Sequence, residues 1–235
     1  MVYQTTLRSG KKVIYYMKAL PDTMTEGEYY SMACIPTGDV AAAKRLHQEG
    51  FAFFDRSIFL EVPLKKFRLP ISPGKKFRFS ITGNWQPEEI YDIAKDAFEN
   101  DFRFSLDPTR KNAELKNELL YGFITDLRQK STMATCLYQE QCLKGFNLWN
   151  ICAGKGRILL GAVSSRYRNS GIAMLLYAHT VEAMKESGAY TLRDFVATSN
   201  LVSLNLHAML IRYAGGEFQF GSGWDYFRKE NNSLN

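Results

Sequence analysis

The sequence predicts a mixed α/β fold in which a small N-terminal α/β unit, residues 1–80, precedes a larger domain, residues 81–235. Three patterns lead to this prediction. A strand–helix–strand pattern fills the first unit, two amphipathic helical segments follow, and a series of strands then alternates with helices. The hydrophobic fraction of 46% is that of a chain with a buried core, so it excludes a disordered protein.

The first unit is predicted from its apolar runs and the turn residues between them. Glu28 to Gly38 is a strand that ends in a Pro/Gly break, and a helix follows with Asp39 at its cap and Gly50 at its end. A second strand, rich in Phe and Ile, begins at Ala52. A unit of this size does not bury both faces of a sheet by itself.

The segment Lys65 to Phe79 carries six basic residues, two prolines and a glycine. This composition favours a linker or an exposed edge strand, which lysine and arginine keep soluble. The alternative is a rim that attracts anions.

The larger domain begins with two helices and continues with strands. Pro87 fits a first helical turn, with Asn84 or Thr82 as its cap, and a loop separates this helix from the next. The further elements are expected as follows: a helix over 112–129, strands over 132–139, 146–153 and 157–165, a helix from Ile172, a strand over 191–199, a helix over 200–215 and a final strand over 218–229.

A basic turn joins the strand at 157–165 to the helix from Ile172. The first turn of a helix has unpaired backbone N–H groups, which bind anions, and Gly171 and the small Ala173 let a ligand approach the backbone. Arg166 and Arg168 add charge-assisted contacts to phosphate oxygens. The turn therefore predicts a site for a diphosphate. The P-loop and Rossmann glycine patterns are both absent from the sequence.

The pattern Arg168-x-x-Gly171-x-Ala173 resembles the acyl-CoA-binding signature of the GNAT N-acetyltransferase superfamily. Thr198-Ser199-Asn200 follows the next strand, as in that family, and a Gly-Gly-x-Phe motif at 215–218 precedes an aromatic last strand. The stretches over 50–64 and 97–108 are similar to the bacterial dTDP-fucosamine acetyltransferase group. Members of that group have a small N-terminal α/β unit before a complete GNAT domain.

This resemblance implies an acetyl-CoA-dependent N-acetyltransferase with a direct attack of an amine on the thioester. It assigns the coenzyme diphosphate to the turn and the pantetheine arm to the end of the preceding strand, with a backbone N–H near Val163 as oxyanion donor. The implied coenzyme-binding residues are Gly161, Ala162, Val163, Arg166, Arg168, Asn169, Ser170, Gly171, Ile172, Ala173 and Asn200.

The proton donor to the leaving thiolate is left open between two residues. The family usually has a tyrosine seven residues after the asparagine that starts the last helix, but counting from Asn200 gives His207. Histidine titrates near physiological pH, so His207 is one candidate. Tyr213, further along the helix, is the other. No general base is visible in the sequence.

The acceptor is expected to contact three further side chains. Arg103, in the loop between the first two helices, is placed to grip a phosphate or a hydroxyl, or else to pair with Asp101 or Asp107. Trp224 and Tyr226 near the end of the chain either stack on a sugar or base ring or belong to the core.

The favoured acceptor is the amine of a nucleotide-linked amino sugar. The alternatives are a peptide or protein amine, and an acyl-CoA-binding protein without catalysis. The net charge of +6 is modest and no nucleic-acid motif accompanies the basic residues, so we expect no nucleic-acid partner. No CxxC pair or long apolar run occurs, so we expect no metal, no membrane partner and a cytoplasmic protein, with a homodimer possible.

Overall fold

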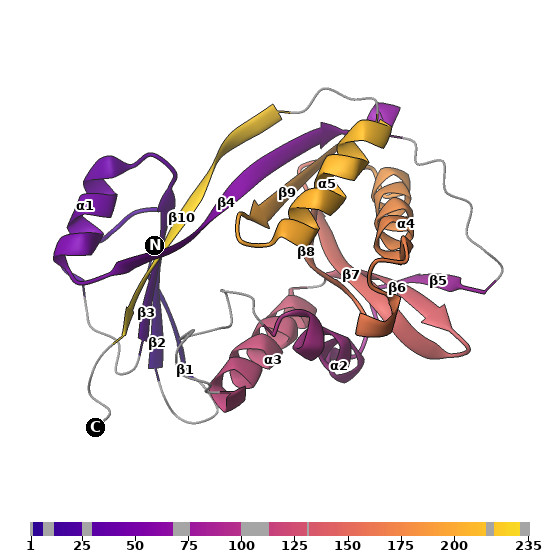
Figure 1. Ribbon diagram of the computed structural model, residues 1–235, viewed down its shortest axis with the longest axis horizontal. Helices are drawn as coiled ribbons and strands as arrows, with labels where there is room; N and C mark the ends of the chain where they lie inside the picture. Colours follow the sequence, from indigo (N-terminus) through magenta and orange to yellow (C-terminus); the bar gives the residue numbers. More distant parts are fainter. Residues whose placement is uncertain are drawn as a thin grey trace. The chain divides into compact units, whose positions relative to one another are not determined.

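The computed structural model describes residues 2–6, 12–24, 30–67, 76–99, 113–130, 132–214 and 219–230. It has two compact units (Figure 1). The smaller unit comprises Met1–Phe59, Phe195–Leu201 and Gly221–Asn235, and the larger unit comprises Leu60–Asp194 and Val202–Phe220. The mixed α/β fold is confirmed. The two units interleave along the chain, whereas the sequence prediction divides it into continuous segments at residue 80, and that division stays a proposal.

The smaller unit is a mixed sheet with one helix. Its strand order is β1-β2-β3-β10-β4. The β1–β2 and β3–β10 pairs are antiparallel and the β2–β3 pair is parallel. The sequence analysis did not predict β1 or β2. The elements are β1 (Val2–Thr6), β2 (Lys12–Met17), β3 (Tyr30–Pro36), α1 (Val40–Gln48) and the unit's parts of β4 (Ala52–Pro63) and β10 (Gln219–Glu230).

Helix α1 begins and ends where its capping residues predict. The side chain of Asp39 accepts a hydrogen bond from the backbone N–H of Ala42 at 3.0 Å. Gly50, just after the helix, has a φ of +82°, a conformation that glycine adopts without strain. The helix adds Leu46 to the apolar core of this unit, which also contains Ile14, Tyr16, Ala33, Ile35, Phe51 and Phe227.

The larger unit has strand order β4-β9-β8-β7-β6-β5. Its further elements are β5 (Arg78–Thr82), α2 (Pro87–Ala97), α3 (Ala113–Gln129), β6 (Met133–Gln139), β7 (Cys142–Cys152), β8 (Lys155–Val163), α4 (Ile172–Glu186), most of β9 (Thr191–Ala197) and most of α5 (Leu201–Ala214). The last part of the basic segment thus becomes β5, at the edge of the strand order, whereas residues 68–75 of that segment lie outside the described residues.

The predicted cap of helix α2 is wrong. The helix begins at Pro87 with Gln86 as its N-cap, and neither Asn84 nor Thr82 holds that position. The physical reason is that proline fixes its own φ and keeps the residue before it extended, so the helix begins directly at Pro87. The Thr82 hydroxyl instead accepts the N–H of Asn84 at 2.9 Å.

Two layers of helices enclose the sheet of the larger unit, with α4 on one face and α2 and α3 on the other (Figure 1). Alternate residues of β7 point to the α4 face. Asn147 donates a hydrogen bond to Thr180 of α4 at 2.9 Å, and Trp149 belongs to the same apolar cluster as α4. The start of α4 packs on the end of β8, because Ile172 and Val163 belong to one apolar cluster.

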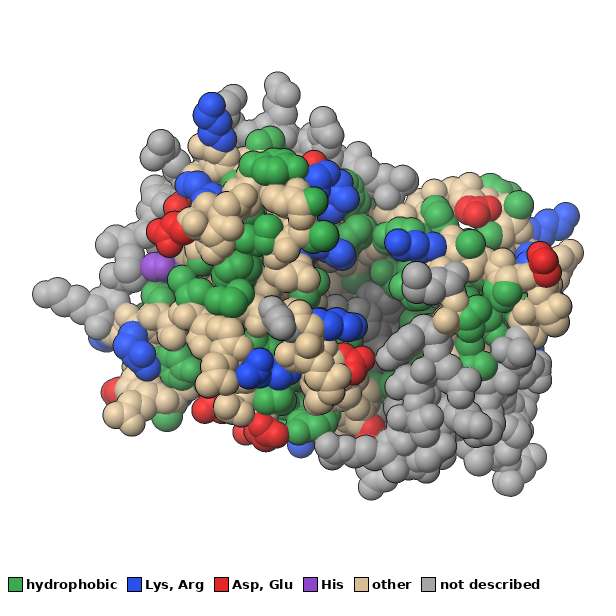
Figure 2. All heavy atoms as spheres, turned by 180° about the vertical axis from the view of Figure 1, so that it is seen from behind, with side chains coloured by type: hydrophobic (Ala, Val, Ile, Leu, Met, Phe, Trp, Pro, Cys, Tyr) green, Lys and Arg blue, Asp and Glu red, His purple; other side chains and the backbone are tan. Residues whose placement is uncertain are grey.

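The described basic side chains do not gather in one patch on the face that Figure 2 shows. On the face drawn in Figure 2, the described Lys and Arg side chains are dispersed among apolar and uncharged groups. No helix in the described part of the chain is long and apolar enough to span a membrane.

Candidate functional site

Strands β8 and β9 pair only where they begin. The parallel register joins Lys155 to Thr191 and Gly156 to Leu192, and it includes none of the later residues of β8. On its other side, β8 stays paired with β7 as far as Val163. The second half of β8 therefore presents a backbone edge that β9 does not cover, and such an edge accepts an extended chain as an additional strand.

The backbone N–H of Val163 points toward this open edge. Ser164 donates its own N–H to the carbonyl oxygen of Lys144 on β7 at 2.9 Å. Hydrogen-bonded and non-hydrogen-bonded pairs alternate in an antiparallel ladder, so the pair of Val163 and Gly145 turns its backbone groups away from the ladder. The N–H of Val163, which the sequence analysis proposes as the oxyanion donor, is therefore not used in the ladder between β7 and β8.

The turn after β8 is built from unusual backbone conformations. A short 3₁₀ helix over Ser165–Tyr167 is followed by Asn169 with a φ of +62° and Gly171 with a φ of +80°. Asparagine and glycine are the residues that adopt positive φ most readily. These two residues turn the chain into α4, which begins at Ile172 after the eight residues that follow β8.

Helix α4 begins with an open N-terminus. Gly171 is its N-cap and no side chain supplies a capping hydrogen bond. The N–H groups of Ile172 and Ala173 have no acceptor within the helix, because the first turn never does. A Cβ placed on Gly171 would meet no atom within 4 Å, so the space beside this backbone is open. Main-chain donors, the positive helix end and open space together fit a phosphate or diphosphate.

The two arginines of the turn differ in their surroundings. Arg168 donates from Nη2 to Asp96 of α2 at 2.6 Å, and its Nε lies 3.3 Å from the Val163 carbonyl. Arg166 is exposed. Arg168 is thereby fixed by a carboxylate that offsets its charge, whereas the Arg166 side chain extends from the surface of the turn.

A profile of the acetyltransferase (GNAT) family matches residues 87–210, which is more than half of the 235-residue chain. The chain belongs to the GNAT acetyltransferase family. The match begins at helix α2, includes the open β8 edge and the turn, and ends within α5. A search of curated proteins gives no significant match.

Solved structures share the GNAT fold at low sequence identity. A GCN5-related N-acetyltransferase from Sphaerobacter thermophilus is 18% identical, with a TM-score of 0.54 over 86% of this chain and 59% of its own. A tandem GNAT protein of the clavulanic acid biosynthesis pathway is 14% identical, with a TM-score of 0.58 over 89% and 66%. The chain therefore spans about three fifths to two thirds of the length of these two proteins.

A third structure is a region of a fungal multi-domain GH3 β-N-acetylglucosaminidase, described as a GCN5-related glucosamine N-acetyltransferase. It is 12% identical, with a TM-score of 0.63 over 97% of this chain and 31% of its own. At these identities the likeness shows the fold alone.

His207 of the GNAT chain lies in a buried polar cluster. Its Nε2 is 3.0 Å from Oδ2 of Asp194, and its Nδ1 is 2.7 Å from the carbonyl oxygen of Ser203. Carbonyl and carboxylate oxygens accept, so this arrangement suits an imidazolium, which donates from both nitrogens. Tyr177 donates to the same Asp194 oxygen at 3.3 Å. Burial lowers the pKa of His207, but the hydrogen bond and charge of Asp194, with the Ser203 carbonyl, raise it further, so the net shift is upward.

The other predicted site residues are distributed as follows. Gly161 to Ala173 come together in the larger unit, at the end of β8 and the start of α4. Asn200, Trp224 and Tyr226 belong to the smaller unit, where Trp224 and Tyr226 lie on β10 opposite Pro36 and Cys34 of β3. Arg103, the motif at 215–218 and the side chain of Tyr213 lie outside the described residues.

Three aspartates that the sequence analysis did not select hold other polar residues in place. Asp96 fixes Arg168, Asp194 pairs with His207, and Asp55 accepts hydrogen bonds from the turn before α5. Asp55 and Asp194 each interrupt a strand that is otherwise mainly apolar, and this isolated acidic position was the available signal.

Proposed function

We propose that the protein is an acetyl-CoA-dependent N-acetyltransferase that acetylates the primary amine of a small molecule, most favourably a nucleotide-linked amino sugar. The observation that supports this most directly is the open backbone of the larger unit. The uncovered edge of β8 suits the extended pantetheine arm, and the uncapped start of α4 beside Gly171 suits the diphosphate. The residues present therefore fit the coenzyme that the family uses.

The proposed reaction needs a fixed thioester and a neutral amine. The amine nitrogen forms a bond to the acetyl carbon, the carbon–sulfur bond breaks, the nitrogen loses a proton to water, and the thiolate gains one. The Val163 N–H, directed at the open edge of β8, is proposed to stabilise the oxyanion. Its contribution depends on the backbone and not on the valine side chain.

The thiolate's proton donor is proposed to be His207 or Tyr213. His207 would have to give up its hydrogen bond to Asp194 or to Ser203 in order to donate outward. Replacing His207 by phenylalanine and measuring turnover of the folded variant tests this role, because unchanged turnover would exclude it. The same measurement on Tyr213→Phe tests the second residue.

The amino-sugar acceptor rests on the resemblance to the dTDP-fucosamine acetyltransferase group. A region described as a glucosamine N-acetyltransferase in a fungal protein has the same fold, and this description supports the choice of an amino sugar. Arg103, Trp224 and Tyr226 are proposed as acceptor contacts. A peptide or protein amine is the alternative, and the basic segment Lys65 to Arg78 counts against a basic peptide.

A non-catalytic acyl-CoA-binding protein is a second candidate, and the burial of His207 favours it. The residue at the position of the usual tyrosine has partners at both nitrogens inside the protein. This candidate predicts coenzyme binding without turnover of any amine. For the acetyltransferase we also propose a cytoplasmic location and a homodimer, with no nucleic-acid or membrane partner.

An amine panel tests the proposed function. The protein is incubated with acetyl-CoA and nucleotide amino sugars, free amino sugars, polyamines, amino acids or peptides, and the released thiol is measured. Thiol release with amino sugars would support the proposal, and release only with peptides would favour the alternative. Calorimetric binding of acetyl-CoA without thiol release would favour the non-catalytic protein, and no binding would contradict all three.

A further inference from the structure

Arg168 covers a backbone acceptor on the open edge of β8. Val163 and Gly145 form a pair without hydrogen bonds across the β7–β8 ladder, so the Val163 carbonyl points away from β7, as its N–H does. The Nε of Arg168 donates to this carbonyl oxygen at 3.3 Å. The guanidinium of the turn therefore lies back on the strand that precedes the turn.

The other end of the Arg168 guanidinium contacts helix α2. Its Nη2 donates to Oδ2 of Asp96 at 2.6 Å, and the two side chains are 39% and 51% exposed. An ion pair between groups this exposed contributes little, because water screens the attraction and the two side chains lose conformational freedom. Arg168 is thus held at the open edge by contacts that a more highly charged anion can replace.

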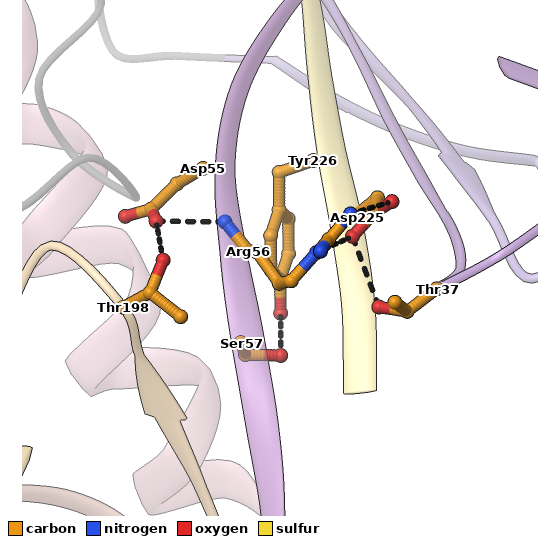
Figure 3. Close-up of polar contacts among 7 residues, drawn as sticks. All are labelled: Thr37, Asp55, Arg56, Ser57, Thr198, Asp225 and Tyr226. Atoms are coloured by element: carbon orange, nitrogen blue, oxygen red, sulfur yellow. Dashed lines mark hydrogen bonds and ion pairs between the residues drawn. The ribbon is translucent and has the colours of Figure 1, made fainter. Parts of the chain in front are cut away.

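Arg56 in the smaller unit shows a stronger arrangement of the same side chain (Figure 3). Its Nε and Nη2 both donate to the carboxylate of Asp225, at 2.6 and 3.0 Å, and the Thr37 hydroxyl donates to that carboxylate at 2.9 Å. The Asp225 side chain is only 10% exposed. Arg168 instead divides its donors between one carboxylate oxygen and one backbone carbonyl, so it lacks the geometric advantage of a bidentate pair.

An extended chain that joins β8 as an additional strand needs the acceptor that Arg168 covers. Such a chain donates its own N–H groups to the outward carbonyl oxygens of the strand that it joins. The amides of the proposed pantetheine arm and the Nε of Arg168 therefore compete for the Val163 oxygen. A carrier that offers only this arm must displace Arg168 without giving the guanidinium a new partner.

A diphosphate removes this competition. Arg168 belongs to the same turn as the open start of α4, where the diphosphate is proposed to bind. Phosphate oxygens accept charge-assisted hydrogen bonds from a guanidinium, and a diphosphate carries more negative charge than the carboxylate of Asp96.

We propose that Arg168 makes the open edge of β8 selective for phosphate-bearing thioester carriers, because it leaves the Val163 carbonyl when a phosphate binds its guanidinium. This inference rests on the proposed function. It gives Arg168 a role beyond coenzyme binding, since the same side chain that grips the phosphate also disfavours carriers that have none.

Two ligands and two variants test this selectivity. Acetyl-CoA carries the diphosphate, whereas acetyl-pantetheine has the same thioester arm without the diphosphate and the nucleotide. Arg168→Met removes the guanidinium and keeps a long unbranched side chain. Arg166→Met is the matched control, because it removes the same charge from an exposed position of the same turn and leaves Arg168 on the Val163 carbonyl. NMR titrations that follow the amide signals of β8 give the Kd of both ligands.

For Arg168→Met we expect opposite changes with the two ligands. The Kd of acetyl-CoA should rise about tenfold, because a charge-assisted contact to phosphate is lost. The Kd of acetyl-pantetheine should fall about fivefold, equivalent to about 1 kcal/mol, because a competing hydrogen bond is removed. Arg166→Met should leave the Kd of acetyl-pantetheine within about 1.5-fold of the wild type, because an uncharged ligand does not respond to the lost charge.

A Kd of acetyl-pantetheine that stays the same or rises in Arg168→Met would overturn the inference, and so would the absence of acetyl-pantetheine binding by this variant. An equal fall of that Kd in Arg166→Met would overturn it too, because any loss of positive charge would then have the same effect. Failure of the wild type to bind acetyl-CoA would refute the proposed function. Binding of acetyl-CoA by the wild type, together with an unchanged Kd of acetyl-pantetheine in Arg168→Met, would refute this inference alone.

Discussion

Replacing His207 by leucine is expected to lower the free energy of unfolding by about 3–5 kcal/mol, the usual cost of removing one partner of a buried ion pair. The buried value applies because the side chains of His207 and Asp194 are both 10% exposed, so water screens their attraction little. The substitution leaves the Asp194 carboxylate buried with the Tyr177 hydroxyl 3.3 Å from its Oδ2. Urea unfolding at pH 6 measures the loss.

The double variant His207→Leu with Asp194→Leu distinguishes the ion pair from lost packing. It removes both charges, so we expect it to be more stable than His207→Leu alone, because the buried carboxylate that has lost its imidazolium is gone as well. A double variant that is less stable than the single variant would show that the attraction between the charges outweighs their burial.

The pair also predicts how stability depends on pH. The pKa of His207 is raised above its ordinary value of 6.5, so the folded protein binds this proton more tightly than the unfolded chain. The resulting stabilisation is complete below pH 6.5 and is lost as the pH rises through the folded pKa. The difference in unfolding free energy between the wild type and the double variant should fall over that window. The reasoning is refuted if His207→Leu unfolds within about 1 kcal/mol of the wild type, or if that difference rises with pH.

Three further substitutions test the turn and the fold. Gly171→Ala should lower the free energy of unfolding in urea by about 1–2 kcal/mol, because residue 171 has a φ of +80°. It should also weaken acetyl-CoA binding in calorimetry, and unchanged binding would show that the diphosphate does not bind at this backbone. Asp96→Asn removes the carboxylate that lies 2.6 Å from Arg168 and offsets its charge. We therefore expect acetyl-CoA to bind more tightly, by less than about tenfold at low salt and by less again at high salt. Weaker binding would instead mean that Asp96 holds Arg168 in its binding position. Asp39→Ala should cost about 1 kcal/mol of stability with an unchanged Kd, and a loss well below that would mean that the Ala42 contact does not cap α1.

The sequence predicted the parts of the fold that depend on local interactions. The helix at Asp39 has its side-chain cap and its glycine end, and the open turn at Gly171 was predicted from one glycine beside a basic strand end. The Pro87 helix was placed correctly, but its cap was not, because the restriction that proline places on the residue before it outweighed the capping preference of Asn84 and Thr82.

The parts that were missed depend on contacts between distant residues. Strands β1 and β2 owe their place to pairing with each other and with β3, and β10 pairs with β3 far away in the sequence. Likewise, no periodicity in the sequence connects Asp55 to Thr198, 143 positions later. A single sequence shows that a polar residue interrupts an apolar strand, but not which donor will lie against it.

Helix α5 illustrates how such contacts fix local structure. Asp55 holds the hydroxyls of the turn that precedes it, and Asp194 holds His207 in its second turn. Each aspartate is buried, and a buried carboxylate without donors is strongly unfavourable, so each interaction specifies one arrangement of the helix end it contacts. Short motifs therefore account for the turn at Gly171, where the backbone itself is proposed to bind the coenzyme. The turn that carries Asn200 depends instead on side chains outside any motif, and its geometry becomes visible only when the strands are in place.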